Sequence, residues 1–325
     1  MSFSKKLISI VIATYKRPEL LTATLNCLAK QTYRPFEIVI VDDGSDTATA
    51  EAVNAWKLQA RPAFDVTYQW QENQGPAAAR NRGLEASHGE LILFLDDDDL
   101  LCPDALEHLA CAIDGRQTAV AMAWYQSWEG GNPQGPLVRP RSSHSTEVVR
   151  SMIQGTWFVP IHGYLFTRTA LEEMGAWNPV LTSQEDDEFL LRAALAGIPF
   201  YAAPQATVYY RQHDGVRRAT PGKPGESVAE GLKKRMIADL MIRESVFETL
   251  RETGGLEPYR VAFLSWQMRL QKRYSSVLSE FSPQSALLDW LETDIDESMG
   301  YPMRSNQGKS VYIVPQAEAS GVFEI

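Results

Sequence analysis

The chain has 325 residues and a formal net charge of −10, so its overall field does not attract nucleic acid, and we exclude nucleic acid as a partner. Its three cysteines are odd in number and match no zinc spacing, so we expect neither a disulfide framework nor a structural zinc site. Neither an N-terminal signal nor an apolar run of membrane-spanning length is visible in the sequence. We therefore expect a cytoplasmic protein, with peripheral contact to the inner face of a membrane left open.

Apolar strands alternate with helical patterns over the first 125 residues. The predicted strands are 7–13, 36–41, 65–70, 91–95 and 119–124, and the predicted helices are 20–30, 47–58, 76–87 and 103–113. This alternation predicts an α/β fold with a mainly parallel sheet that helices cover on both faces. Ligands of such sheets bind beyond the carboxyl ends of the strands, so the residues after each strand are the first candidates for a site.

The second half of the chain is less regular. Residues 129–147 are rich in Gly, Pro and Ser and predict a surface loop, as do residues 217–225. Between these loops we expect helices over 169–174 and 186–196 and an extended segment over 200–210.

After residue 225 the pattern becomes helical, with helices expected from Val228 to the pair Gly254-Gly255 and over 261–281. The chain therefore divides into an α/β domain, 1–225, and a helical C-terminal region, 226–325. We expect these last helices to pack on the chain or to form a homodimer, ahead of a membrane contact.

Four aspartates in a row, Asp96, Asp97, Asp98 and Asp99, follow the strong apolar strand that ends at Leu95. Two carboxylates about 4 Å apart repel each other by roughly 4 kcal/mol at an effective dielectric near 20, so the run needs a counter-charge. A hard cation such as Mn²⁺ or Mg²⁺ supplies it and leaves coordination positions open for a diphosphate. Asp99 is also placed to cap the helix that follows.

Two shorter motifs follow the first two strands. After the first come Ala13, Thr14 and Tyr15, where a tyrosine ring can stack on a nucleobase and backbone groups can read its edge. After the second come Asp42 and Asp43, which can accept hydrogen bonds from a base or from ribose hydroxyls. An ordinary turn or helix cap explains the two aspartates equally well.

Three further residues suit a nucleotide diphosphate. Gly75 allows close backbone approach at the start of a helix, where anions are favoured, and Arg80 follows on that helix. Arg17 stands in the loop after the first strand, and we place it with them on the nucleotide side. The small residues around Arg80 are explained equally well by tight helix packing.

The acidic helix start at Glu185 and Asp186 predicts a general base, although a helix dipole alone also favours acidic residues there. His213 follows an extended segment and is a candidate metal ligand. Arg217 and Arg218 come next and can neutralise a diphosphate. We place Glu185 with them on the acceptor or diphosphate side.

Six segments, in this order, resemble family 2 glycosyltransferases of the GT-A fold over roughly residues 7–215: "SIVIATYKRP", "VDDGS", "NQGPAAARN", "LFLDDDD", "EDDEFLLR" and "YRQH". The resemblance implies a Rossmann-like sheet with a donor-nucleotide half over about 1–105 and an acceptor half over about 106–225, and the helical C-terminal region lies outside it. It also implies inverting sugar transfer from a nucleoside-diphosphate sugar, with UDP the expected nucleotide, in the presence of Mn²⁺ or Mg²⁺. The expected acceptor is a glycan, a lipid-linked molecule or a small molecule.

The same resemblance assigns roles to the donor side. Thr14 and Tyr15 would line the base pocket, and Asp43 would bind the base with support from Asp42. Asp97 would lie near the ribose and the metal.

On the catalytic side, Asp98 would be the main metal ligand, together with Asp96, and His213 would approach the metal or the diphosphate. Asp186 would be the base. The family's Asp-any-Asp motif also fits the register Asp97/Asp99, but we favour Asp96/Asp98 because Asp96 ends the strand directly. Asp187 departs from the pattern, since many relatives carry an aromatic residue there.

Two other functions are compatible with parts of the pattern. A sugar-nucleotide pyrophosphorylase shares a related α/β plan, but its glycine-rich signature is missing from residues 14–18. A non-catalytic nucleotide- or glycan-binding module would not need the set Asp98, Asp186 and His213.

Overall fold

The computed structural model describes residues 5–140, 142–181, 183–213, 227–278 and 285–293. The described residues fall into two compact units. The first lies within Met1–Val149, Trp157–Leu181 and Glu185–Asp214, and the second within Arg150–Thr156, Thr182–Gln184 and Gly215–Ile325. The second unit thus holds the predicted helical region plus two short segments from earlier in the chain. The predicted loop 217–225, with Arg217 and Arg218, lies outside the described residues.

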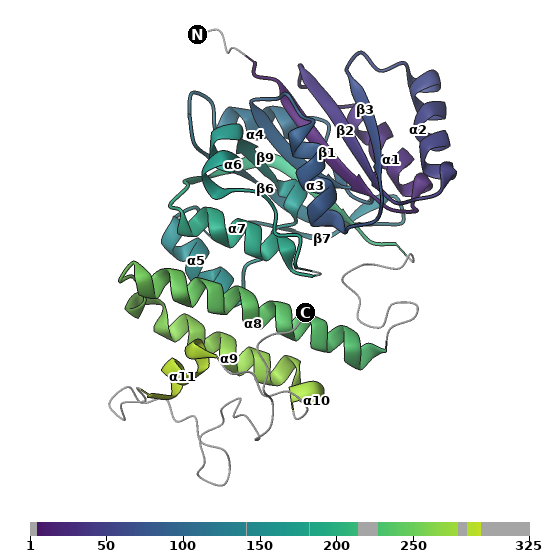
Figure 1. Cartoon of the computed structure of the whole chain (residues 1–325). Coiled ribbons are helices and arrows are strands. Elements are labelled where there is room, and N and C mark those ends of the chain that lie inside the picture. Colours follow the sequence, from purple (N-terminus) through teal and green to yellow (C-terminus); the bar gives the residue numbers. More distant parts are fainter. Residues whose placement is uncertain (1–4, 141, 182, 214–226, 279–284, 294–325) are drawn as a thin grey trace. The chain divides into compact units, whose positions relative to one another are not determined.

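The first unit is built on one sheet, in which the described residues form nine strands (Figure 1). The strands are β1 Ile8–Thr14, β2 Phe36–Asp43, β3 Val66–Gln71, β4 Leu91–Asp96, β5 Leu100–Leu101, β6 Val120–Glu129, β7 Asn132–Val138, β8 Tyr164–Thr167 and β9 Phe200–Arg211. They are ordered β3-β2-β1-β4-β8-β6-β9-β5, and β7 pairs with β6. The pairs among β3, β2, β1 and β4 are parallel, as is β6 with β9, whereas β8, β5 and β7 pair antiparallel. The predicted mainly parallel sheet is confirmed.

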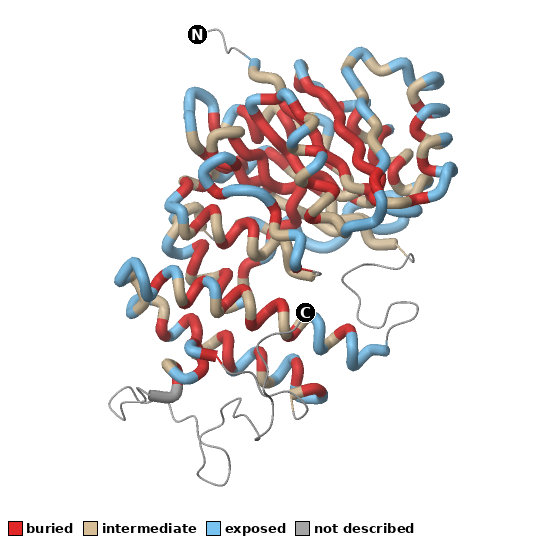
Figure 2. The backbone as a smooth tube through the Cα atoms, in the orientation of Figure 1, coloured by how far each residue is buried: buried red, intermediate tan, exposed pale blue. Residues whose placement is uncertain are grey.

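Helices cover both faces of this sheet (Figure 1). They are α1 Pro18–Ala29, α2 Thr47–Ala60, α3 Pro76–Glu85, α4 Ala105–Ala112, α5 Ser145–Ile153, α6 Arg168–Met174 and α7 Glu185–Leu195, and η1 Ile161–Gly163 is a short 3₁₀ helix. Helices α1, α2 and α4 pack on the face that carries Ile8, Ile10 and Ile12. On the opposite face, Ala79 of α3 packs against Val39 and Val41. The central strands β1, β2 and β4 are accordingly buried, whereas β7 and the outer helix faces are exposed (Figure 2).

The second unit is helical, with α8 Val228–Glu252, η2 Glu257–Tyr259, α9 Arg260–Arg273, α10 Ser275–Leu278 and α11 Ala286–Thr293. Ser227 and Glu230 form a reciprocal capping box at the start of α8. At its end, Gly254 has φ +70°, a conformation that suits glycine and stops the helix where the sequence predicts it. In the described part of the chain, no helix is long and apolar enough to cross a membrane.

Two predictions about elements are wrong. Residues 129–147 are not a loop, because β6 and β7 form a hairpin there and α5 begins at Ser145. The glycines that suggested a loop are the turn itself, since Gly130 and Gly131 have φ +58° and +86°. The helix expected over 261–281 ends at Arg273, and α10 follows as a separate turn. The sequence also missed β8, which has only four residues and depends on its two neighbours for pairing.

Candidate active site

The four aspartates leave the carboxyl end of β4 in a tight turn that leads to β5. The Asp97 carboxylate is held from the first strand, because Thr14 Oγ1 donates to its Oδ2 at 2.6 Å and Arg17 Nη1 donates to its Oδ1 at 3.1 Å. The same guanidinium reaches Asp98 Oδ2 at 2.8 Å. Thr24 donates to the backbone carbonyls of Asp97 and Asp99 and so fixes the turn. Thr14 and Arg17, predicted to serve the nucleotide, thus contact the aspartate run.

Arg80 joins the aspartate turn to the acidic helix start. Its Nη2 donates to Asp96 Oδ1 at 2.7 Å, and its Nη1 donates to Asp186 Oδ1 at 3.0 Å and lies 3.6 Å from Glu185 Oε1. The guanidinium is only 5% exposed. A buried charge needs such partners, and three carboxylates supply them. Residues 90 positions apart in the chain, Asp96 and Asp186, therefore share one cation.

Aromatic packing sets the position of Arg80. Its guanidinium lies 4.5 Å from the Trp177 ring centroid, and Trp177 stacks on Phe189 of α7 at 3.9 Å with an angle of 5° between the rings. Asn81, the next residue of α3, exchanges two hydrogen bonds with the Trp177 backbone, at 2.8 and 2.9 Å. Trp177 therefore ties α3 to α7, a role that the sequence did not reveal.

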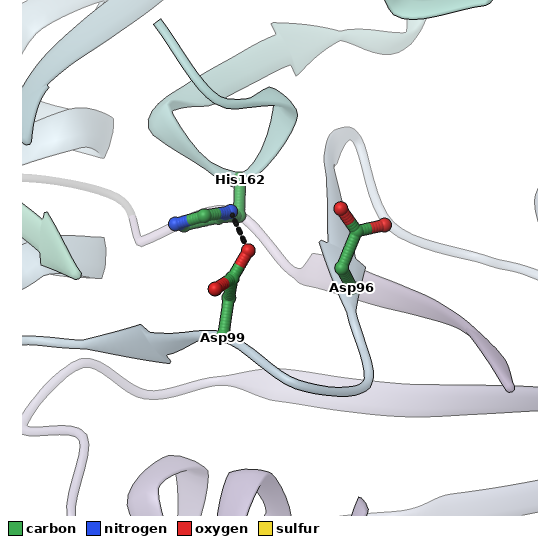
Figure 3. A group of neighbouring side chains, drawn as sticks. All are labelled: Asp96, Asp99 and His162. Carbon is green, nitrogen blue, oxygen red and sulfur yellow. Dashed lines mark ion pairs between the residues drawn. The ribbon is translucent and has the colours of Figure 1, made fainter. Parts of the chain in front are cut away.

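His162 of η1 meets two of the aspartates (Figure 3). Its Nδ1 lies 3.2 Å from Asp99 Oδ2, and one ligand atom each of His162, Asp99 and Asp96 fall within 4.8 Å of one another. Among the described residues, neither ring nitrogen has a well-aligned hydrogen-bond partner. Burial lowers the pKa of His162 to about 4, against the charges of Asp96 and Asp98 and the nearby Tyr209 backbone, so the ring is neutral at pH 7 and offers a lone pair. These donors fit a divalent cation.

The end of β9 closes the other side of the turn. His213 Nε2 lies 3.0 Å from Asp98 Oδ2, so two predicted metal ligands do lie together. The Arg211 backbone N–H donates to Asp99 Oδ1 at 2.7 Å, and its side chain donates to the Asp98 carbonyl. Asp98 is 17% exposed and His213 12%, compared with 2% for Asp99 and 0% for His162. The three predicted metal ligands are thus divided between two groups. Asp98 lies with His213, whereas Asp96 lies with Asp99 and His162.

Burial gives these carboxyl groups different proton affinities. It raises the pKa of Asp186 to about 8, an effect that Arg80 opposes and the Glu185 charge increases. The Asp186 side chain is 37% exposed, so solvent screens part of this effect. Burial also raises the pKa of Asp97 to about 7, against the opposing Arg17 charge. For Asp96 burial acts in the same direction, but Arg80 outweighs it and the net pKa is lowered.

Asp42 and Asp43 bind donors from the protein itself. Asp42 accepts from the Ser45 N–H at 2.8 Å and from the Tyr68 hydroxyl at 2.6 Å. Asp43 accepts from Gln71 and from the backbone N–H groups of Gln74 and Gly75, at 2.8, 2.9 and 2.8 Å. Asp43 therefore holds the loop that starts α3, where Gly75 has φ +90°, and Asp42 ties the loop after β2 to β3. Contact with a nucleobase stays a prediction for both.

The edge formed by β1, β2 and β3 also carries two half-exposed rings. Tyr15 is 44% exposed, and Trp70, which the sequence analysis did not single out, is 51% exposed. Ser45 links them, because its Oγ accepts from the Lys16 N–H at 2.7 Å and its carbonyl from Trp70 Nε1 at 3.1 Å. Ala13 pairs with both neighbouring strands at the same edge. This edge can stack a flat ring.

Residues 9–175 match the sequence profile of glycosyl transferase family 2, which spans about half of the chain. EpsH of Bacillus subtilis (strain 168), named as a glycosyltransferase, is 39% identical over 265 residues, which cover 78% of this chain and 72% of EpsH. The chain therefore belongs to glycosyl transferase family 2 and is a glycosyltransferase. This membership decides against the pyrophosphorylase and the non-catalytic module.

Solved structures agree on the fold. TarS of S. aureus in complex with UDP-GlcNAc aligns with a TM-score of 0.55 and 19% identity, covering 84% of this chain and 80% of TarS. The mannosyltransferase PcManGT of Pyrobaculum calidifontis in complex with GDP-Man and Mn²⁺ aligns with a TM-score of 0.57 and 18% identity, covering 90% and 82%. The first unit thus has the GT-A fold expected from the sequence, and the second unit is helical, as also expected.

Proposed function

We propose that this glycosyltransferase moves a sugar from a nucleoside-diphosphate sugar, expected to be a UDP-sugar, to an acceptor hydroxyl with inversion. The observation that carries the proposal is the shared contact of Arg80 with Asp96 and Asp186. One guanidinium nitrogen of Arg80 binds Asp96, on the donor side, and the other binds Asp186, the candidate base. One displacement at the anomeric carbon needs a base on one side and a stabilised leaving group on the other.

Asp186 is the proposed base. Its raised pKa suits proton abstraction near neutral pH, because a base works best when its pKa lies near the working pH. Arg80 keeps the carboxylate oriented, and Glu185 lies beside it on the acceptor or diphosphate side. Inversion follows because the acceptor oxygen attacks directly, without a covalent intermediate on the protein.

Asp98 and His213, with Asp96 nearby, are the proposed ligands of a catalytic Mn²⁺ or Mg²⁺. When bound, this cation would neutralise charge that develops on the leaving diphosphate. We favour this pair over Asp99 and His162 because a catalytic cation needs open positions for the donor, and Asp98 and His213 are the more exposed pair. Arg217 and Arg218 are proposed to assist on the diphosphate side.

The donor nucleotide is proposed to lie over the β1–β2–β3 edge. Tyr15 and Trp70 offer ring faces there, and TarS, whose fold is similar, binds UDP-GlcNAc. We propose residues 1–105 as the donor-nucleotide half and 106–225 as the acceptor half. Action in the cytoplasm, peripheral membrane contact and a homodimer through the helices after 225 also remain proposals.

The decisive experiment compares Asp186→Asn with Asp187→Asn. Asp186→Asn should lower kcat for sugar transfer by about 10²- to 10⁴-fold, because general base catalysis contributes that much. Its affinity for UDP-sugar with Mn²⁺ should stay within about twofold, and Asp187→Asn should retain most activity. Near wild-type transfer by Asp186→Asn, with a large loss in Asp187→Asn, would move the base to the neighbouring carboxylate.

A further inference from the structure

An aromatic cluster lies outside the donor site. Phe158, in the loop between α5 and η1, is 53% exposed. The Tyr125 and Tyr210 rings contact it at centroid distances of 5.4 and 5.9 Å, both at 81°. These edge-to-face contacts are the favourable geometry for ring pairs, so they hold Phe158 in place while half of its surface faces solvent. We call Phe158, Tyr125 and Tyr210 the Phe158 cluster.

The sheet fixes the two tyrosines. Tyr125 belongs to β6 and Tyr210 to β9, which pair in parallel with Tyr125 opposite Val208 and Ser127 opposite Tyr210. Because side chains alternate along a strand and paired residues share a face, Tyr125 and Tyr210 lie on the same face of the sheet. Two of the three rings of the cluster therefore lie on paired strands, and Phe158 reaches them from the loop between α5 and η1.

Tyr164 interacts both with the residue before Phe158 and with the charges at the start of α7. Trp157, the residue before Phe158, donates its indole N–H to the Tyr164 hydroxyl at 2.8 Å. Burial raises the pKa of Tyr164, and the charges of Asp187 and Asp186 raise it further, as does Tyr125. Tyr164 thus lies within electrostatic reach of both the cluster and the start of α7.

The cluster is also close to the aspartate turn. Tyr210 is three residues from His213, so the Cα atoms of these two residues are at most about 10 Å apart. His213 Nε2 in turn lies 3.0 Å from Asp98 Oδ2. Phe158 is four residues from His162, which lies 3.2 Å from Asp99. All of these residues belong to the first unit. An occupant of the cluster would therefore lie beside the reacting groups, on the acceptor half of the chain.

We propose that the Phe158 cluster stacks on a sugar ring of the acceptor and so selects a carbohydrate acceptor. This inference rests on the proposed function. A pyranose has an apolar face of C–H groups and a rim of hydroxyls, which matches an apolar ring bordered by the hydroxyl-bearing rings of two tyrosines. An acyl chain would need a larger continuous apolar surface than one half-exposed ring provides.

The test uses the full chain with UDP and Mn²⁺ and a panel of methyl glycosides, followed by saturation-transfer-difference NMR with irradiation of aromatic protons. Ring C–H protons of at least one methyl glycoside should receive saturation in the wild type. Phe158→Ala should weaken that glycoside's binding about tenfold or more, because it removes the exposed ring face on which the sugar is proposed to stack. Phe158→Trp should restore it. Leu58→Ala, a change at an exposed apolar residue of α2, is the control and should have no effect.

Three outcomes would overturn the inference: no glycoside signal in the wild type, equal signals in Phe158→Ala, or displacement of the glycoside by ribitol, a linear polyol, at equal concentration. Nucleotide release from UDP-sugar in the absence of acceptor keeps the two proposals apart. If wild type and Phe158→Ala release nucleotide equally while the glycoside signal is insensitive to Phe158, only the acceptor inference fails. If neither releases nucleotide from any donor, the proposed function fails instead.

Discussion

At the scale of single residues, the site depends on how a few buried charges are paired. Arg80 contacts Asp96, Asp186 and Glu185, while Arg17 contacts Asp97 and Asp98. Burial raises the pKa of Asp97 and of Asp186 although each contacts an arginine, whereas at Asp96 the Arg80 charge outweighs burial and the pKa is lowered. A single short turn thus contains carboxyl groups whose pKa values are shifted in opposite directions.

The raised pKa of Asp186 predicts the pH dependence of transfer. The base must be ionised, so kcat/KM should rise about tenfold per pH unit below the pKa and level off above about 8. Initial rates from about pH 5 to 9 at saturating Mn²⁺ measure this, with Asp187→Asn as the control that should keep the profile. A rate that is flat across this range would contradict the assignment of Asp186.

The two histidines predict different responses to metal. His213→Ala should weaken Mn²⁺ binding in the presence of UDP about tenfold or more, because it removes a ligand of the more exposed pair. His162→Ala should leave that affinity within about twofold. Titration of Mn²⁺ followed by electron paramagnetic resonance measures both variants. The opposite ranking would assign the cation to Asp96, Asp99 and His162.

At the scale of elements, α3 is a closely packed link between the sheet and the site. A Cβ atom at Gly83 would lie 2.3 Å from Val11 Cγ1, well inside van der Waals contact. Arg80 lies three residues earlier on the same helix. The distance between α3 and β1 therefore helps to set where the guanidinium lies.

Gly83→Ala should consequently destabilise the protein by about 1–2 kcal/mol. Overpacking costs about 1–3 kcal/mol, and the higher helix propensity of alanine offsets up to about 1 kcal/mol of this cost. It should also lower kcat, since Arg80 must shift with the helix. Urea unfolding and transfer rates measure the two effects. Val11→Ala in the same chain should restore part of both. Asn54→Ala, on the exposed side of α2, is the control and should not destabilise the protein.

At the scale of the whole molecule, the described chain consists of a sheet-based unit and a helical unit. The second unit has its own buried charge pair, in which Arg243 Nη1 lies 2.8 Å from Asp239 Oδ1. Arg243 also donates to the Met152 carbonyl at 2.9 Å, which explains why residues 150–156 belong to this unit. The described helices of this unit also bury apolar side chains of their own, among them Phe247, Phe263 and Trp266.

Donor binding should stabilise the whole molecule in a metal-dependent way. With UDP-sugar and Mn²⁺ at about 100 times Kd, the free energy of unfolding should rise by about 2.7 kcal/mol, because only the folded chain binds them. Thermal unfolding with and without EDTA measures this. Asp98→Asn should lose most of the shift. A shift of the same size in the presence of EDTA would show that donor binding does not need a cation.

The sequence by itself determined the order of strands and helices in the first 125 residues and the location of acidic groups after strands. These features are local, because they depend on the spacing of apolar residues and on where a strand stops. The same local reading failed at the β6–β7 hairpin and at β8, where pairing with neighbouring strands decides the structure.

Only the tertiary structure decided where each side chain of the site points. Asp97 faces Thr14 and Arg17, Asp98 faces His213, and Asp99 faces His162, because the run forms a turn rather than a continued strand. The pairing of Arg80 with Asp186 and the exposure of Phe158 likewise depend on contacts between distant parts of the chain. Sequence spacing carries no information on such contacts, since packing of the helices on the sheet brings these residues together.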